Sequence, residues 1–280
     1  MTRAASVVLL CAVALVAVAQ PPKPPANRNI RYGTPSPAKA DPVASPNDYL
    51  LERPQYVMSY NEKRHSANWV CWHLTKADIG NVARGAFEED PDLPKEFKRV
   101  QHGTYSGSGF DRGHLCPSKD RSRTEKDNDA VFLMSNMLPQ SPACNQKAWE
   151  RLERYCRELA DGGAELYIAC GGHGVGGVSE DGQKKLNIGR AGLFVTVPAH
   201  CWKVILVAPN KIRAPDATTR TIAVWMPNDN TVTEDWTKYR VPVAEVEKKT
   251  GYTFWPLLPD DVSKAIKEKA DDAKVVVPLK

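Results

Sequence analysis

The sequence predicts a mixed α+β domain that combines a largely antiparallel sheet with packed helices. Short runs of β-branched and aromatic residues are separated by turn-forming residues, one segment has strong helical periodicity, and further strand-like runs follow that helix. Strands, a helix and then more strands, without regular alternation, are typical of the α+β class. The chain has 280 residues, of which 42% are hydrophobic and 25% charged, so it can bury one sizeable core.

The first 48 residues are predicted to lie outside that domain. Arg3 precedes an apolar run of about 16 residues that ends in the pattern Ala17-Val18-Ala19, which is typical of a signal peptide at residues 1–19. A membrane anchor, the competing interpretation, needs roughly 20 apolar residues. Residues 20–48 are rich in Pro, Ala and Ser and predict a flexible leader. We therefore expect an exported protein, secreted or periplasmic, without a membrane anchor.

The domain itself is predicted at residues 49–259 and begins with a β-hairpin. Two strand-like runs, at residues 56–60 and 69–74, flank the turn-forming sequence NEKR. Prolines and glycines between residues 91 and 109 mark loops. A helix is expected at residues 145–159, because four of its residues recur at the spacing of a buried face: Trp149, Leu152, Cys156 and Leu159.

Four strands and a short helix complete the predicted domain. The helix is expected at residues 243–250, where Gly251 ends it. A charged helical tail is expected at residues 260–280. The glycine-rich segment CGGHGVGG lacks the spacing of a phosphate-binding loop, so we interpret it as a connection between strands. The strands are expected at residues 165–170, 193–198, 201–208 and 220–226.

Charge and cysteine content constrain the function only loosely. The formal charge of +5 suits a polyanionic partner without requiring one. Seven cysteines are present, and removal of the signal peptide would take Cys11 and leave six. An even number permits disulfides in an oxidising compartment. Six cysteines allow 15 pairings and include no C-x-x-C zinc pattern, so the sequence leaves both bridges and buried thiols open.

Two segments gather side chains that could carry chemistry. The stretch FDRGHLCPSKDRS places His114 among several charged groups. In the predicted helix, residues spaced four apart lie about 40° from one another and form one ridge. The simpler interpretation is a solvated face, whereas Asn145 either caps the helix or offers an amide oxygen to a divalent cation. The ridge contains Asn145, Trp149, Glu153 and Arg157.

Three motifs, taken in order, resemble a known family. They are DRGH at residues 111–114, SNMLPQ at residues 135–140 and NQKAWERLE at residues 145–153. Their order and spacing resemble the DNA/RNA non-specific endonucleases, the ββα-metal class that includes secreted bacterial nucleases and mitochondrial endonuclease G. The resemblance runs from about residue 56 to residue 255. It implies a ββα-metal active-site motif within the α+β core, and cleavage of DNA and RNA that leaves 5′-phosphate ends.

The resemblance also implies roles for seven residues. His114 corresponds to the general base, Asn145 to the magnesium ligand, and Glu153 to the acidic residue that binds the water shell of the metal. Mg²⁺ is the implied cofactor, with Mn²⁺ as an alternative, DNA and RNA are the implied substrates, and a homodimer stays open. Arginines around the scissile phosphate, a further catalytic-site arginine in RGAFEED, and an asparagine near the site complete the set: Arg112, Arg157, Arg84 and Asn136.

Elementary chemistry supports these roles. A histidine is largely neutral at pH 7 and can take a proton from water, which phosphodiester hydrolysis requires. Mg²⁺ stabilises developing negative charge and needs only one or two protein ligands. Arginine forks onto phosphate oxygens with a geometry that lysine lacks.

Three alternatives were weighed against this hypothesis. His114 on its own would be interpreted as an ordinary loop histidine. A Cys116 nucleophile acting with His114 is disfavoured, because thiolates attack phosphodiesters poorly, whereas a disulfide between Cys116 and Cys144 stays open. A catalytically inactive nucleic-acid-binding module of the same fold would be expected to lack His114, Asn145 or Glu153, and all three are present.

Overall fold

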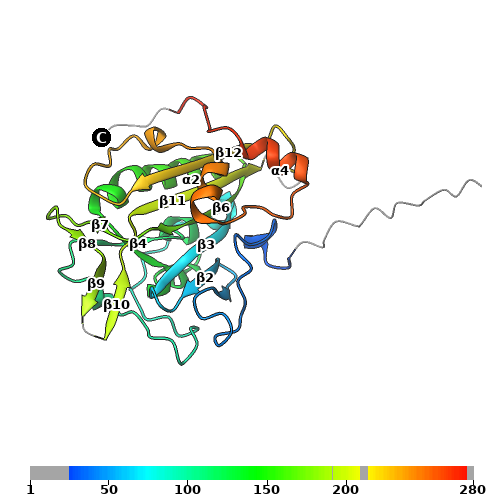
Figure 1. The fold of residues 1–280 in the computed structure, drawn as a ribbon. Helices are drawn as coiled ribbons and strands as arrows, with labels where there is room; N and C mark the ends of the chain where they lie inside the picture. The colour runs from blue at the N-terminus through cyan, green and yellow to red at the C-terminus, as the bar shows by residue number, and fades with distance from the viewer. Residues whose placement is uncertain (1–24, 191, 209–213, 276–280) are drawn as a thin grey trace, which may run out of the picture.

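The computed structural model describes residues 25–190, 192–208 and 214–275, and its core is a six-stranded sheet (Figure 1). The strand order is β1-β2-β3-β6-β11-β12, and every neighbouring pair is antiparallel. The predicted hairpin is the β2–β3 pair, and the predicted fold class is confirmed. The six strands are β1 (Tyr49–Glu52), β2 (Val57–Asn61), β3 (Ser66–Leu74), β6 (Glu165–His173), β11 (His200–Ala208) and β12 (Arg220–Pro227).

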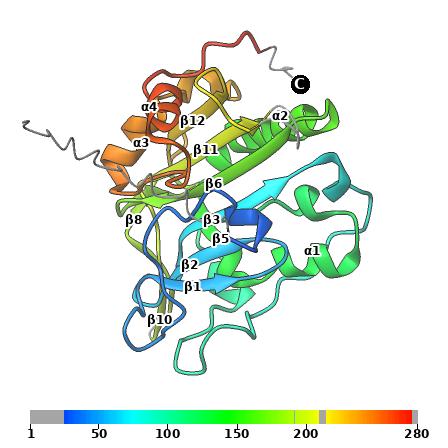
Figure 2. The same ribbon diagram turned by 90° about the vertical axis from the view of Figure 1, so that its right-hand side faces the viewer.

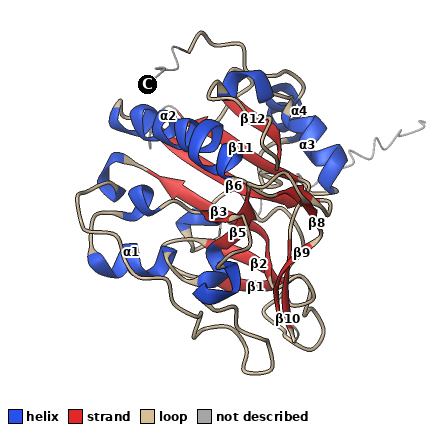
Figure 3. Cartoon of the chain, turned by 90° about the vertical axis from the view of Figure 1, so that its left-hand side faces the viewer, coloured by secondary structure: helices blue, strands red, loops and turns tan. Residues whose placement is uncertain are grey.

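Helices cover both faces of this sheet (Figures 2 and 3). α2 (Glu150–Asp161) packs on one face, whereas α3 (Val243–Thr250) and α4 (Asp260–Lys267) pack on the other. Successive side chains of a strand point to opposite faces, so β11 feeds two apolar cores. Because both faces are buried, its sequence is mostly apolar rather than alternating, and Lys203 is the one charged residue within it. Cys201 and Ile205 enter the core beneath α2, and Trp202, Val204 and Leu206 enter the core beneath α3 and α4.

Short elements surround the main sheet. The expected strand at residues 193–198 forms only β10 (Leu193–Thr196), which pairs with β9 (Asn187–Arg190) outside the main sheet. The remaining strands form two further antiparallel pairs: β4 (Asp111–His114) with β5 (Met137–Gln140), and β7 (Gly177–Val178) with β8 (Lys184–Lys185). Single 3-10 turns occur at Arg28–Ile30, Lys76–Asp78, His102–Tyr105, Ser118–Arg121, Met134–Asn136 and Trp236–Tyr239.

One short helix, α1 (Glu125–Val131), was not predicted. Thr124 caps it by accepting a hydrogen bond from the backbone N–H of Asp127 at 3.1 Å. Four of its seven residues are charged, so no apolar periodicity reveals it in the sequence.

The structure corrects the predicted leader. Part of residues 25–48 packs against the sheet: Asn29 and Ile30 are 4% and 6% exposed, whereas Val43 is 86% exposed. The side chain of Asn29 donates to the backbone carbonyls of Arg53 and Pro54, and its oxygen accepts the backbone N–H of His73. The composition predicted a flexible leader and gave no signal for this short tertiary anchor. The predicted signal peptide and residues 20–24 lie outside the described residues.

The structure also corrects the predicted helical tail. α4 ends at Lys267, and Ile266 is buried on the sheet. Farther along, Asp271 forms ion pairs with Arg220 at 2.8 Å and with Arg240 at 3.4 Å. Asp271 therefore serves as an ion-pair partner within the fold, and residues 276–280 of the predicted tail lie outside the described residues. Among the residues described, no helix has the length and apolar character needed to cross a bilayer.

Candidate active site

Six of the seven residues predicted for the site line one pocket of about 470 Å³. Two strands and a helix build it: β4 supplies Arg112 and His114, β5 pairs with β4, and the helix follows β5. Gly113 leaves room for the side chain of Gln140 on β5, since a Cβ atom there would lie 1.9 Å from Gln140 Oε1. The six lining residues are Arg84, Arg112, His114, Asn145, Glu153 and Arg157.

Asn145 lies inside a helix and does not cap one. The backbone from Cys144 to Trp149 is a π-helix that continues directly into α2, so the predicted single α-helix is wrong for its first turn. The N–H of Asn145 donates to the carbonyl of Ser141 at 2.9 Å, which excludes the capping interpretation. Short π-helical segments are frequent at functional sites. Asn145 still reaches the same pocket as Glu153 and Arg157.

Asp111 orients the side-chain amide of Asn145. Its Oδ2 atom accepts hydrogen bonds from Asn145 Nδ2 and from Gln146 Nε2, each at 2.8 Å. Because the amide nitrogen of Asn145 is committed to Asp111, its oxygen is left as the free acceptor of that side chain. Asp111 belongs to the DRGH motif, but the sequence alone gave no indication of this role.

His114 is held between two phenylalanine rings. Its imidazole packs edge-on against Phe132 at 4.8 Å between ring centroids, and lies 5.8 Å from Phe87. Burial, together with the positive charge of Arg84, lowers the pKa of His114 to about 3. Its Nε2 atom is buried and has no hydrogen-bond partner among the described residues. His114 is therefore a neutral imidazole at physiological pH.

The same two rings support two arginines. The guanidinium of Arg84 lies 5.3 Å from the centroid of Phe132, and that of Arg112 lies 4.8 Å from Phe87. Within the described part of the chain, neither arginine forms an ion pair with a carboxylate. Two uncompensated guanidinium groups beside a neutral histidine make a site suited to an anion.

Glu153 belongs to a buried network of charges. Glu153 Oε1 accepts a hydrogen bond from Lys203 Nζ at 3.3 Å, and Arg157 donates to Asp120 at 3.1 Å. Burial raises the pKa of Glu153 to about 7, against the opposing effect of the Lys203 and Arg157 charges. Asp120 is fixed in turn by the indole N–H of Trp72 at 3.0 Å. Glu153 and Arg157 of the predicted ridge thus pair with Lys203 and Asp120, two residues outside the helix that its spacing could not predict.

Asn136 does not line the pocket. It is completely buried, where its side chain donates to the carbonyls of Cys116 and Val131 and accepts the N–H of Cys116 at 3.0 Å. These bonds brace the loop that follows His114. Asn136 therefore lies near the active site, as the sequence resemblance implies, but it supports the loop after His114 and does not line the pocket.

The cysteines lie apart from this chemistry. Cys116 is completely buried, burial raises its pKa well above the ordinary thiol range, and it does not line the pocket. This arrangement disfavours a Cys116 nucleophile. All six cysteines from Cys71 to Cys201 are unpaired, so the structure contains no bridge between Cys116 and Cys144.

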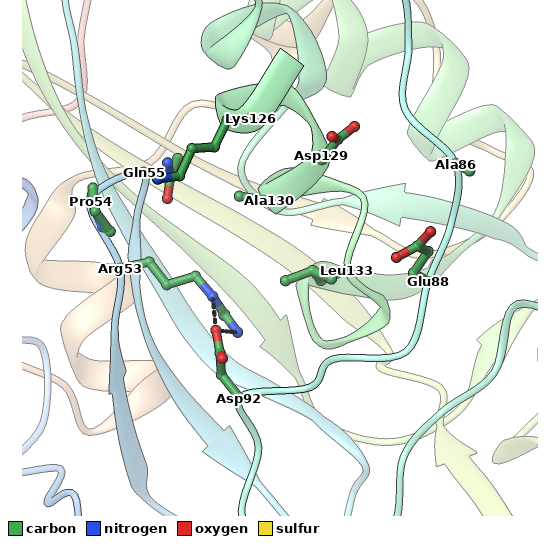
Figure 4. A pocket seen from close by; sticks show the side chains of 10 residues that line it. All are labelled: Arg53, Pro54, Gln55, Ala86, Glu88, Asp92, Lys126, Asp129, Ala130 and Leu133. Carbon is green, nitrogen blue, oxygen red and sulfur yellow. Dashed lines mark hydrogen bonds and ion pairs between the residues drawn. The ribbon is translucent and has the colours of Figure 1, made fainter. Parts of the chain in front are cut away.

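A second pocket of about 490 Å³ is lined in part by the segment that follows Arg84 (Figure 4). Ala86 and Glu88 of that segment line it, together with Asp129 of α1 and the ion-paired Arg53 and Asp92. Acidic groups outnumber basic ones along its wall, and none of the predicted site residues reaches it. It is therefore poorly suited to a polyanion, in contrast to the pocket around His114.

The buried His114 should make stability depend on pH. The folded state holds its pKa near 3, whereas an unfolded histidine titrates near 6.5, so below pH 6.5 the unfolded chain binds a proton that the native state lacks. Stability is therefore greatest above pH 6.5 and falls as the pH decreases toward 3. Between about pH 7.5 and pH 5, wild type should lose about 2 kcal/mol more unfolding free energy than His114→Ala in urea titrations. Equal losses would show that His114 is not held neutral.

Comparison with known proteins agrees with this fold and pocket. The sequence pattern of the DNA/RNA non-specific endonucleases matches residues 35–261. A nuclease of Nostoc sp. (strain PCC 7120 / SAG 25.82 / UTEX 2576) is 41% identical over 242 residues, covering 85% of this chain and 84% of the relative. Nuclease C1 of Cunninghamella echinulata var. echinulata is 36% identical over 222 residues, covering 76% and 84% respectively. A chain in the crystal structure of the EndoG/EndoGI complex superposes with a TM-score of 0.67 at 27% identity, covering 83% of this chain and 91% of that one.

Fold, pocket and relatives together define a nuclease. The chain belongs to the DNA/RNA non-specific endonuclease family, the family that its three sequence motifs resemble.

Proposed function

We propose that this nuclease hydrolyses the phosphodiester bonds of DNA and RNA with His114 as general base and Mg²⁺ as cofactor, and leaves 5′-phosphate ends. The observation that carries the proposal is one pocket in which a neutral imidazole faces an amide oxygen, a carboxylate and unpaired arginines. A neutral imidazole accepts a proton, and the arginines attract a phosphate. Each of these properties is needed for hydrolysis, and a pocket built only for binding would not require the first.

The proton transfer is assigned to His114. The imidazole takes a proton from the attacking water as the new oxygen–phosphorus bond forms, and the bond from phosphorus to the O3′ of the leaving strand breaks. Phe132 and Phe87 keep bulk water from the ring, which preserves its neutral form. General-base catalysis of this kind contributes about 10²- to 10⁴-fold to a rate.

The arginines are assigned to the phosphate. Arg84 and Arg112 have no competing carboxylate among the described residues, and phenylalanine rings limit their freedom. Their fork geometry suits two phosphate oxygens. Their attraction to the phosphate strengthens as negative charge develops on it in the transition state. Contacts to phosphates carry no base information, so this arrangement supports low sequence specificity.

The donor set of the pocket fits a magnesium ion. Mg²⁺ prefers oxygen ligands, keeps several waters and takes one or two protein groups. Asn145 would supply its free amide oxygen, and Glu153 would hydrogen-bond the water shell of the ion. Within the described residues no cluster of three or more His, Cys, Asp or Glu side chains is placed to hold a metal, which a hydrated ion does not need. When bound, Mg²⁺ would stabilise the negative charge on the leaving oxygen as a Lewis acid.

Export of the mature protein is part of the proposal. The support is the N-terminal sequence, in which Arg3, an apolar run and Ala17-Val18-Ala19 match the organisation of a cleaved signal. The secreted and periplasmic fates share this signal, and fractionation of the native host would separate them.

The proposed cofactor can be tested by removal of divalent ions. Purified mature protein should convert supercoiled plasmid and single-stranded RNA to short fragments in Mg²⁺, and EDTA should abolish both activities because the leaving group loses its Lewis acid. Products should need phosphatase treatment before a kinase can label their 5′ ends. Undiminished cleavage in EDTA would contradict metal dependence, and intact substrates with every divalent ion tried would reject the nuclease mechanism as a whole.

A further inference from the structure

Lys203 is a buried cation directly beneath the active-site helix. Its side chain is 1% exposed, and it lies on β11, between β6 and β12, on the face of the sheet that α2 covers. Its Nζ atom lies 3.3 Å from Glu153 Oε1 and 4.1 Å from the centroid of the Trp149 ring. The ring of Trp72 is 5.5 Å away on another side. Lysines rarely occupy such positions unless they are paired.

Stability alone does not account for a lysine at this position. Burial of an ammonium and a carboxylate has a desolvation cost that their attraction often fails to recover, and apolar residues of similar volume are frequently as stable. The surrounding residues of the strand are apolar, so a methionine or leucine would suit the local packing. A function for the charge itself is therefore the better explanation.

Glu153 depends on Lys203 for its position. Arg157 is engaged by Asp120 at 3.1 Å, so Lys203 provides the hydrogen bond that Glu153 receives within the described residues. Lys203 donates its hydrogen bond to Glu153 Oε1. No described residue donates to Glu153 Oε2, and Glu153 lines the pocket. One oxygen is thus anchored, and the other is left for the pocket.

Lys203 also contacts the neighbouring turn of the same helix. Trp149, on which its ammonium packs, donates its indole N–H to the backbone carbonyl of His114 at 3.4 Å. One side chain of the sheet therefore contacts both Glu153 and the residue that joins the helix to the His114 strand. This contact sets the position of the helix ridge relative to β4.

We infer that Lys203 is a positioning residue of the nuclease site: its ammonium holds the Glu153 carboxylate where it and Asn145 serve one divalent ion. The inference rests on the proposed function and deepens it. Lys203 does not line the pocket, so its effect on metal binding should pass through the side chains that it contacts, chiefly Glu153.

Variants that separate charge from packing test the inference. Lys203→Met keeps an unbranched side chain of similar length and removes the ammonium. The matched control is Lys267→Met, because Lys267 is also buried, pairs with Glu247 at 2.8 Å, and lies in α4 on the opposite face of the sheet. Mn²⁺ affinity is measured by electron paramagnetic resonance without nucleic acid, and kcat, KM and Tm are measured alongside.

Lys203→Met should weaken Mn²⁺ binding and lower kcat, each by about 10- to 100-fold, with little change in the KM for DNA. Lys267→Met should lower only Tm. In a Glu153→Gln background, Lys203→Met should cause no further loss of Mn²⁺ affinity, because the two residues act as one unit. Wild-type Mn²⁺ affinity in Lys203→Met, or losses that multiply in the double variant, would overturn the inference.

Two further results keep the test decisive. If Lys203→Met does not fold, ¹⁵N spectra of the lysine ammonium groups in the wild-type protein replace it: the Lys203 signal should shift on Mg²⁺ addition and the Lys267 signal should not. An unmoved Lys203 signal would overturn the inference. If wild type itself neither binds Mn²⁺ nor cleaves DNA, the proposed function fails instead, and the two failures are thereby distinguished.

Discussion

Replacement of His114 by alanine is expected to lower kcat for DNA cleavage by about 10²- to 10⁴-fold while the protein stays folded and binds DNA. The imidazole is neutral and lies beside the unpaired arginines, so its loss removes the proposed proton acceptor and leaves the arginines that we propose bind phosphate. Single-turnover cleavage of a labelled duplex measures the rate. Anisotropy in EDTA measures binding, which should change by less than about threefold.

Chemical rescue provides the control for this variant. The space vacated by His114 is walled by Phe87 and Phe132, which suits a small planar base. Added imidazole should therefore restore part of the activity of His114→Ala but none of the activity of Asn145→Ala. If His114→Ala keeps more than about a tenth of the wild-type cleavage rate, His114 is not the proton acceptor.

The sheet and the main helix could be predicted because their signals are local. β11 contains an unbroken apolar run from Val204 to Val207, and the register of residues 149–159 gives a buried helical face. The packed segment at Asn29 and Ile30 could not be predicted in this way. Two residues that hydrogen-bond and pack against a distant strand leave no periodic pattern.

The surface of the site was also largely predictable from the sequence. Helical spacing brought Glu153 and Arg157 to one ridge, and the motif DRGH kept Arg112 beside His114. The π-helical turn at Asn145 was not predictable, because a change from i+4 to i+5 bonding alters no residue type. Asn145 nevertheless lines the same pocket as Glu153 and Arg157.

The residues that support the site could not be predicted from the sequence, because they act through tertiary contacts. Phe87 and Phe132 hold the histidine and two arginines, yet each resembles an ordinary apolar residue in the sequence. Lys203 did carry a signal, since a charged residue within the run CWKVILVA contradicts the apolar pattern of a buried strand. A charge that breaks such a pattern indicates a buried partner, here Glu153.

Replacement of Asn145 by alanine is expected to weaken Mn²⁺ binding and to lower kcat by at least about 100-fold, because it removes the amide oxygen that would ligate the ion. Calorimetry with Mn²⁺ in the absence of nucleic acid measures the first effect, and plasmid cleavage measures the second. Raising the Mg²⁺ concentration should recover part of the activity of this variant. The same treatment should leave His114→Ala inactive, since that variant retains the residues that we propose hold the ion.

Gln146 supplies the matched control for Asn145. Both side chains donate to Asp111 Oδ2 at 2.8 Å and both line the pocket, so Gln146→Ala removes an amide with the same partner. If ligation by the Asn145 oxygen is the decisive property, Gln146→Ala should lose less than about tenfold in affinity and rate. If neutralisation of Asp111 is decisive instead, the two alanine variants should lose equally, and Asp111→Ala should restore activity to both. Equal losses of affinity and rate in the two variants would therefore show that Asn145 acts by binding Asp111 and not by binding the ion.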